Sequence, residues 1–162
     1  MINRRDFCKN ILGAGAVLGY PLAISEANPT REEDVGEILR SIADVIANTD
    51  DVFSHQSEFL LEFLTQPGQL YAGIGFGTGA DAIIQACRNA CNCRLLKKRF
   101  LKEASTILVI VTGGPDMSLQ EVNDAVEPIR DQIDVTKGVS FQIVFKDDMT
   151  DKRRVTIIAC VA

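Results

Sequence analysis

Apolar and polar residues follow helical and strand periods along the chain from residue 35 onward. Apolar residues recur every three or four positions in 35–46 and again in 59–64, so both segments are expected to form amphipathic helices, and Pro67 ends the second. A continuous apolar run of β-branched residues predicts a buried central strand, and two more apolar runs predict strands after it; these three lie at 106–112, 139–145 and 155–161.

The remaining elements adjoin two glycine-containing turns. A strand is expected at 69–74, running into the glycine-dense 73–79, and a helix follows from about residue 80. Ser118 and Glu121 have the spacing of a capping box, which opens another helix that extends to residue 133. Elements in this order predict an α+β fold, a two-layer sandwich in which a four-stranded mixed sheet carries helices mainly on one face.

The composition is that of a soluble globular domain with a short appendage. The chain has 162 residues, of which 46% are hydrophobic and 24% charged, and its formal net charge is −5. These values exclude a disordered or collagen-like chain. The acidic balance also argues against nucleic acid as a partner, because a protein that grips nucleic acid needs a basic face.

The first 27 residues have the three-part layout of an export signal. A basic start is followed by the apolar stretch 11–25 and by small residues before a cleavage point after Ala27. The start resembles the twin-arginine signal that exports folded proteins in bacteria, through Arg4, Arg5, Phe7 and Lys9. We therefore expect a signal peptide at 1–27 and a linker at 28–34, with an amphipathic or buried first helix as the alternative. No stable membrane span is expected, since a bilayer-crossing helix needs roughly 20 apolar residues.

The glycine run fits a nucleotide-binding loop only in part. Gly75, Gly77 and Ala80 match the pattern G-x-G-x-x-A between a strand and a helix. No acidic residue follows in the strand-end context that dinucleotide-binding folds need, because 94–102 is basic. A tight strand-to-helix turn is therefore favoured over a nucleotide site.

Other candidate chemistry is sparse. Cys87, Cys91 and Cys93 lack the spacing of a zinc site, and the first two lie on the apolar stripe of their helix, so core packing is expected. His55 is the only histidine, in a loop with too few partners for a triad or a metal cluster. Six basic residues gather in 88–102 and form either a solvated helix end or a surface for an acidic or phosphorylated partner.

One stretch resembles a known family. Residues 109–125, VIVTGGPDMSLQEVNDA, are similar to the carboxy-terminal domain of FtsZ, the tubulin-like cell-division GTPase, whose members carry T-G-G-x-D-x-x-L-x-E-V-N after a strand. Residues 72–81 and 148–159 look like the first and last strands of that domain, and 37–46 like the end of the family's central helix. The motif residues in this chain are Thr112, Gly113, Gly114, Asp116, Glu121 and Asn123.

The resemblance implies domain boundaries and a limit on activity. A helical lead-in would occupy 35–68 and the FtsZ-like domain 69–162, so the glycine run would belong to the sheet domain and not to a nucleotide site. In the family, GTP is held by an amino-terminal domain, for which the residues before Val35 offer no counterpart. Activation in the family also needs a loop with the pattern N-x-D-x-x-D after the central helix. Neither possible register keeps this acid pair, and the degenerate loop candidates are Ser54, His55, Gln56 and Glu58.

We therefore expect an interaction or assembly domain related to cell-division GTPases, not an enzyme. It should have no catalytic residue, no metal and no cofactor of its own, with GTP present only if a partner subunit supplies it. The expected partner is a protein: a second copy or a tubulin-like protein. One alternative is the activating half of a split tubulin-like GTPase, and another is an exported binding protein that reuses the fold.

The two ends of the chain bear on location. The signal predicts the periplasm, whereas the family resemblance implies the cytoplasm at the division site. The family's terminal peptide for membrane-tethering division proteins has no counterpart after the last strand, so those partners are not expected.

Overall fold

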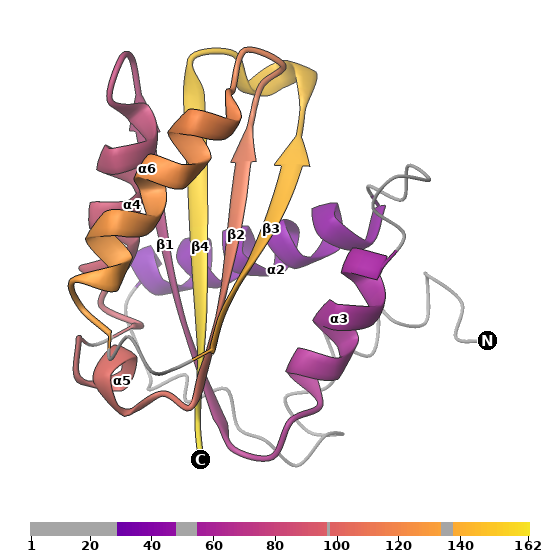
Figure 1. The fold of residues 1–162 in the computed structure, drawn as a ribbon, viewed down its shortest axis with the longest axis vertical. Helices are drawn as coiled ribbons and strands as arrows, with labels where there is room; N and C mark the ends of the chain where they lie inside the picture. The colour runs from indigo at the N-terminus through magenta and orange to yellow at the C-terminus, as the bar shows by residue number, and fades with distance from the viewer. Residues whose placement is uncertain (1–28, 48–54, 97, 134–137) are drawn as a thin grey trace.

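The computed structural model describes residues 29–47, 55–96, 98–133 and 138–162 (Figure 1). The predicted signal, with Arg4, Arg5, Phe7, Lys9 and Ala27, lies outside the described residues. In chain order the elements are α2 (Pro29–Ala47), α3 (His55–Leu64), β1 (Gln69–Thr78), α4 (Ala82–Cys91), α5 (Lys98–Glu103), β2 (Thr106–Gly113), α6 (Leu119–Arg130), β3 (Gly138–Phe145), the 3₁₀ turn η2 (Asp147–Met149) and β4 (Lys152–Val161).

The strands form one mixed sheet of four strands in the order β1-β4-β2-β3. Strand β4 runs antiparallel to both of its neighbours, whereas β2 and β3 are parallel. The parallel pair needs a crossover connection, and α6 supplies it. The predicted α+β fold with a four-stranded mixed sheet is therefore confirmed.

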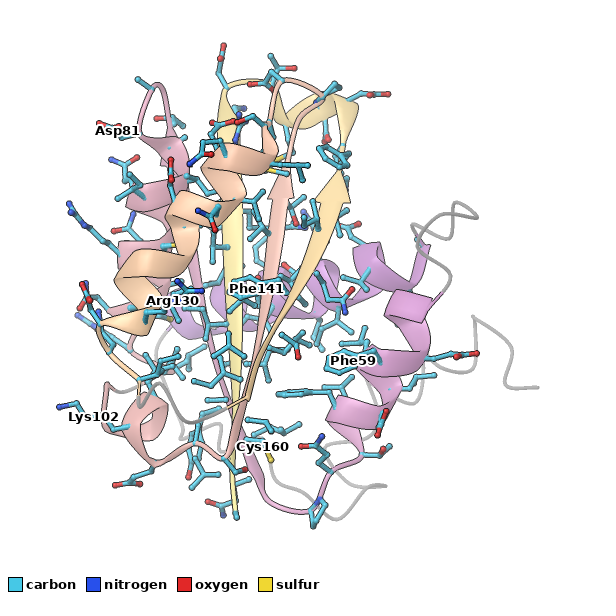
Figure 2. The ribbon with its side chains drawn as sticks, viewed as in Figure 1. Phe59, Asp81, Lys102, Arg130, Phe141 and Cys160 are labelled. Atoms are coloured by element: carbon cyan, nitrogen blue, oxygen red, sulfur yellow. The ribbon has the colours of Figure 1, made fainter. Side chains whose placement is uncertain are left out.

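Helices cover both faces of this sheet. The crossover helices α4 and α6, together with α5, enclose one apolar core against residues such as Val109 and Ile157. The lead-in helices α2 and α3 enclose a second core on the other face, against residues such as Leu108 and Ile158. Figure 1 shows α4 and α6 in front of the sheet and α2 crossing behind it, and the labelled Phe59 of α3 packs against this second core (Figure 2). The domain's own helices thus share one face, as predicted, and the lead-in adds a third layer.

The glycine run is part of a strand, so the turn predicted at 73–79 is wrong. Strand β1 continues through the run to Thr78, and the chain turns only afterwards, at Gly79, whose φ is +82°. The backbone of α4 lies directly on the strip formed by Gly73, Gly75 and Gly77. A Cβ on Gly73 would stand 2.6 Å from the carbonyl oxygen of Ala90, and the other two would lie still closer to α4 carbonyls. The glycines therefore permit a close helix-on-strand approach.

Several other elements differ from the predicted ones: α3 begins at His55 instead of 59, and α6 ends at Arg130 instead of 133. Helix α2 begins at Pro29, so nearly all of the predicted linker at 28–34 is helical, and proline suits a first helical position. The basic stretch contains a separate short helix, α5, that the apolar pattern did not indicate. Strand β4 begins at Lys152 and includes Arg153 and Arg154, which the prediction left in a loop. Within the described residues, no helix is both long and apolar enough to span a membrane.

Candidate functional site

Two adjacent arginines at the start of β4 are buried. Arg153 and Arg154 are only 3% and 4% exposed. Side chains of consecutive strand residues point to opposite faces of a sheet, so one guanidinium enters each layer. A buried charge is unfavourable unless it is paired, so each layer must supply acceptors.

The Arg153 cluster lies on the α6 face and consists of Arg153, Asp116 and Glu121. The Nη2 atom of Arg153 donates hydrogen bonds to Asp116 Oδ2 at 3.0 Å and to Glu121 Oε1 at 3.2 Å. Asp116 Oδ2 also accepts from the backbone N–H of Asp151 at 3.3 Å. The cluster therefore joins the β2–α6 turn to the start of β4.

Glu121 also completes the predicted capping box, which is confirmed. The backbone N–H of Ser118 donates to Glu121 Oε2 at 2.7 Å, and the N–H of Glu121 donates to Ser118 Oγ at 3.2 Å. Hydrogen bonding to the Arg153 guanidinium lowers the pKa of Asp116, and the bond from the Ser118 N–H lowers the pKa of Glu121. Both carboxylates are ionised at neutral pH, where they serve as acceptors and are poor proton donors.

The Arg154 cluster lies on the α2 face and consists of Arg154, Glu37, Asp44 and Thr112. Arg154 donates to Glu37 Oε2 at 3.3 Å, to Asp44 Oδ2 at 2.5 Å and to Thr112 Oγ1 at 3.3 Å. Lys146 Nζ donates to the other oxygen of Asp44 at 3.1 Å. Between the two carboxylates on α2, Ser41 Oγ accepts from the buried Thr156 hydroxyl at 2.8 Å. These bonds tie one polar stripe of α2 to β4.

The structure divides the predicted motif residues between the two clusters and leaves one outside both. Thr112 belongs to the Arg154 cluster, and Asp116 and Glu121 belong to the Arg153 cluster. Gly114 lets the turn close, because a Cβ there would stand 2.5 Å from Asp116 Oδ1. Asn123 is exposed on α6 and lies in neither cluster. Gly113 lies opposite Arg153 in the pairing of β2 with β4.

The degenerate loop candidates are described only in part. Ser54 lies outside the described residues. His55 and Gln56 were predicted to lie in a loop, which is wrong, because they begin α3; only their backbone is described. Glu58 is exposed in the first turn of α3.

Neither helix start beside the sheet presents a ready anion site. At α6, the capping box engages backbone donors that a phosphate would need. At α4, Asp81 occupies the N-cap position, labelled in Figure 2, and its carboxylate would repel an anion. The glycine strip of β1 lies beneath α4 and is paired with β4, so it does not form a phosphate-binding loop.

The cysteines pack in the core. Cys87 and Cys91 are fully buried on α4, as predicted from the apolar stripe. Burial raises the pKa of Cys87 to about 12, so its thiol stays protonated and unreactive. In the described part of the chain, no three or more His, Cys, Asp or Glu side chains come close enough to hold a metal ion.

Residues 68–161, more than half of the chain, match the sequence profile of the FtsZ family, C-terminal domain. The chain belongs to the FtsZ family. Its FtsZ-like region includes the glycine strip, the β2–α6 turn and both buried arginines.

Individual FtsZ proteins are also similar to this chain in sequence. The chain is 38% identical over 96 residues to the cell division protein FtsZ of Caulobacter vibrioides, covering 59% of this chain and 19% of that protein. It is 32% identical over 96 residues to FtsZ of Magnetospirillum gryphiswaldense, covering 59% of this chain and 17% of that protein. The chain therefore spans less than a fifth of the length of these FtsZ relatives.

Solved structures share the fold at lower identity. An empty FtsZ dimer of M. jannaschii aligns with a TM-score of 0.64 at 17% identity, covering 86% of this chain and 41% of that one. A GTPγS-form protofilament of TubZ from Bacillus thuringiensis serovar israelensis aligns with a TM-score of 0.54 at 10% identity, covering 77% and 36%. At these identities, the alignments show a common FtsZ/tubulin-like fold.

Arg153 and Arg154 were missed as site residues because they directly precede an apolar run and were assigned to a polar loop. One signal could have found them. Two adjacent cations at the start of a strand point to opposite faces, and Glu37 and Asp44 lie seven residues apart on one predicted helix face, where they can pair with one of the two.

Proposed function

We propose that this protein is a non-catalytic interaction or assembly domain of the FtsZ/tubulin type. The observation that carries the proposal is the use of the motif side chains. Asp116 and Glu121 hold the buried Arg153, and Thr112 accepts from the buried Arg154. All three groups form ion pairs or hydrogen bonds within the fold, and the pKa values of Asp116 and Glu121 are lowered. The strongest polar constellation in the domain is thus structural.

The glycine strip supports the same proposal. A phosphate-binding loop needs backbone N–H groups that point at the ligand from a helix N-terminus. In β1, Gly73, Gly75 and Gly77 are strand residues paired with β4 and covered by α4. A nucleotide would have to displace α4 to reach them.

The assembly part of the proposal draws on the relatives. The M. jannaschii FtsZ structure is described as a dimer and the TubZ structure as a protofilament, and both share this chain's fold. A domain of this kind that has no chemistry of its own would act through contacts with a second copy or with a tubulin-like protein.

The test is a GTP-binding and GTP-hydrolysis assay on the purified full chain. A fluorescent GTP analogue should show no saturable binding, and phosphate release should match buffer, while an intact FtsZ assayed in parallel gives both signals. The proposal is wrong if the folded chain releases phosphate and a Gly75→Glu variant, in which α4 cannot pack on β1, does not.

A second candidate function is activation of a nucleotide held by a partner FtsZ. The supporting observation is Glu58, an exposed carboxylate in the first turn of α3, because one of the two possible registers of the family's activating-loop pattern places an acidic position on it. Adding the chain to an intact FtsZ would then raise its GTPase rate. Glu58→Ala should abolish the increase and Glu62→Ala, another exposed acid on α3, should not. Equal effects of the two variants, or no increase at all, would reject this candidate.

We also propose export to the periplasm by a twin-arginine signal, on the basis of Arg4, Arg5, Phe7 and Lys9. Cell fractionation should find the protein in the periplasm, shortened after Ala27. The double variant Arg4→Lys, Arg5→Lys should remain in the cytoplasm. If the wild-type chain and the double variant are both found in the cytoplasm, the export proposal is wrong and the division site becomes the expected location. If both are found in the periplasm, export does not depend on the twin-arginine pair.

A further inference from the structure

The sheet has two edge strands, β1 and β3, and among the described residues side chains block the outward backbone groups only at the end of β1. An edge strand exposes backbone N–H and C=O groups that can pair with another chain, and proteins usually block them. In β1, Asn89 Nδ2 on α4 donates to Phe76 O at 2.8 Å, and Thr78 N donates to Gln85 Oε1 at 3.1 Å. Two side chains of α4 therefore occupy the outward groups where a further strand would bind.

Strand β3 has no such protection among the described residues. Its ladder to β2 continues into the bond from Lys146 N to Gly113 O, so even-numbered residues bond inward. Odd-numbered residues alternate with them and direct their N–H and C=O groups away from the sheet. Gly138–Phe145 also contains no charged residue and no proline, which are the usual guards of an edge.

The same outward residues carry apolar side chains on the α6 face that are incompletely covered. Val139, Phe141 and Ile143 are half-buried, and Phe145 is 42% exposed. On the neighbouring β2, the side chains on that face are fully buried. Helix α4 lies on β1 and β4, and β3 is the outermost strand on the other side of the sheet (Figure 1). On the opposite face, α3 packs against the core through Leu60 and Phe63.

We propose that β3 is a docking edge for β3 of a second copy of this chain, paired antiparallel about a two-fold axis at Gln142. Residues opposite each other in an antiparallel pair share a face. With the axis at Gln142, Phe141 lies opposite Ile143 and Val139 opposite Phe145, so every outward residue of both strands is paired. The two sheets then form one continuous eight-stranded sheet. This proposal specifies the partner in the assembly function proposed above and rests on it.

Charge and symmetry select a second copy as the occupant. Two copies of a chain with net charge −5 repel each other, and the repulsion is weakest where an uncharged strand meets an uncharged strand. A two-fold contact also uses both unprotected edges at once and closes the assembly. The open-ended alternative, β3 of one copy on β1 of the next, would require Gln85 and Asn89 to leave their bonds to β1.

The size of the contact predicts a weak dimer. An eight-residue strand is about 27 Å long, and a sheet with its side chains is about 10 Å thick, which gives an edge of a few hundred Å² per copy. Stable complexes bury about 800 Å² per partner. The dimer should therefore form in a concentration-dependent way, at high micromolar protein.

The first test is sedimentation of the full chain over a concentration series. The mass should rise from monomer toward dimer and no further. Ile143→Lys places a charge on the outward edge without removing a bond to β2, and should weaken the dimer at least about tenfold. Phe76→Lys alters an exposed aromatic of the protected edge and should leave the dimer unchanged. Circular dichroism checks that both variants fold.

The second test fixes the register in the wild-type edge. In a chain with Cys8 and Cys93 replaced by serine, Gln142→Cys should give an intermolecular disulfide under mild oxidation, because opposed residues of a non-hydrogen-bonded pair lie about 4.5 Å apart. Ser140→Cys, which would face Val144 of the copy, should not. A chain that stays monomeric, a dimer insensitive to Ile143→Lys, or larger species lost in Phe76→Lys would each overturn the proposal. A monomer that also lacks GTPase activity would leave the non-catalytic assignment standing, whereas GTP turnover would remove that assignment whatever the oligomeric state.

Discussion

Replacing Arg154 by methionine should cost about 3 kcal/mol of folding free energy. The substitution keeps the side-chain stem but removes the donors to Glu37, Asp44 and Thr112. Breaking a buried ion pair from one side costs about 3–5 kcal/mol, because the remaining charge stays buried without its partner. Water reaches Glu37 and Asp44, whose side chains are 27% and 17% exposed, and Lys146 still pairs with Asp44. These two effects put the expected loss at the lower end of that range.

Urea unfolding followed by circular dichroism measures the loss. With a slope of about 1–3 kcal/mol per molar urea, the midpoint should fall by roughly 1–3 M with no change in slope. Arg88→Met, which removes an exposed arginine from α4, is the matched control and should change stability by less than about 0.5 kcal/mol. A loss below about 1 kcal/mol in Arg154→Met would refute the reasoning, because it would mean that the carboxylates on α2 do not depend on this cation.

A double-mutant cycle distinguishes two causes of this loss: the buried carboxylate that is left without a cation, and the hydrogen bonds that are removed. If Asp44 is neutralised by asparagine in the Arg154→Met background, the uncompensated charge disappears. The double variant should therefore be more stable than the sum of the two single losses predicts, with a coupling of about 1–3 kcal/mol. Additive losses would indicate that the two side chains act independently.

Three further predictions test other parts of the structure. Gly75→Ala forces a Cβ into the α4 backbone and should destabilise the chain by about 1–3 kcal/mol in urea melts, whereas Gly36→Ala, in open space on α2, should stabilise it by about 0.5–1 kcal/mol. The pKa values of Asp116 and Glu121 are lowered in the folded chain, so their contribution to stability is fully present above the ordinary values of 3.8 and 4.5 and is lost as the pH falls through the folded values. Tm should therefore fall in acid, and it should fall less steeply in the double variant Asp116→Asn, Glu121→Gln. Burial raises the pKa of Cys87 to about 12, so mass spectrometry should find it unmodified by an alkylating reagent at mildly alkaline pH until urea unfolds the chain.

The sheet could be predicted from local pattern because its strands have strong period and composition. The continuous β-branched run predicted at 106–112 is β2, whose side chains are almost all buried. The capping box at Ser118 marks the start of α6 to the residue, since both of its reciprocal bonds form. Such signals depend on neighbouring residues only, so they survive without knowledge of the tertiary fold.

The course of β1 could not be read locally, because glycine weakens strands and marks turns in most sequences. What keeps Gly73, Gly75 and Gly77 in a strand is the α4 backbone, which comes too close for any side chain. A pairwise signal was nevertheless available. Small residues recur every two positions in β1 and every four in α4, at Ala82, Ala86 and Ala90, and these are the periods of facing strand and helix surfaces.

The sequence predicted which motif residues belong to the candidate site, but not how they are arranged. That arrangement depends on how β4 pairs with β2. Thr112 and Gly113 are the register partners of Arg154 and Arg153, so the strand pair carries the motif and the two cations side by side. Strand β4 is central in the sheet and its consecutive residues face opposite layers. Arg153 therefore anchors α6 and the β2–α6 turn, while Arg154 anchors α2, and the two clusters share no side-chain acceptor. The polar groups of the motif are thus divided between the two faces of the sheet, where they help to hold its three layers together.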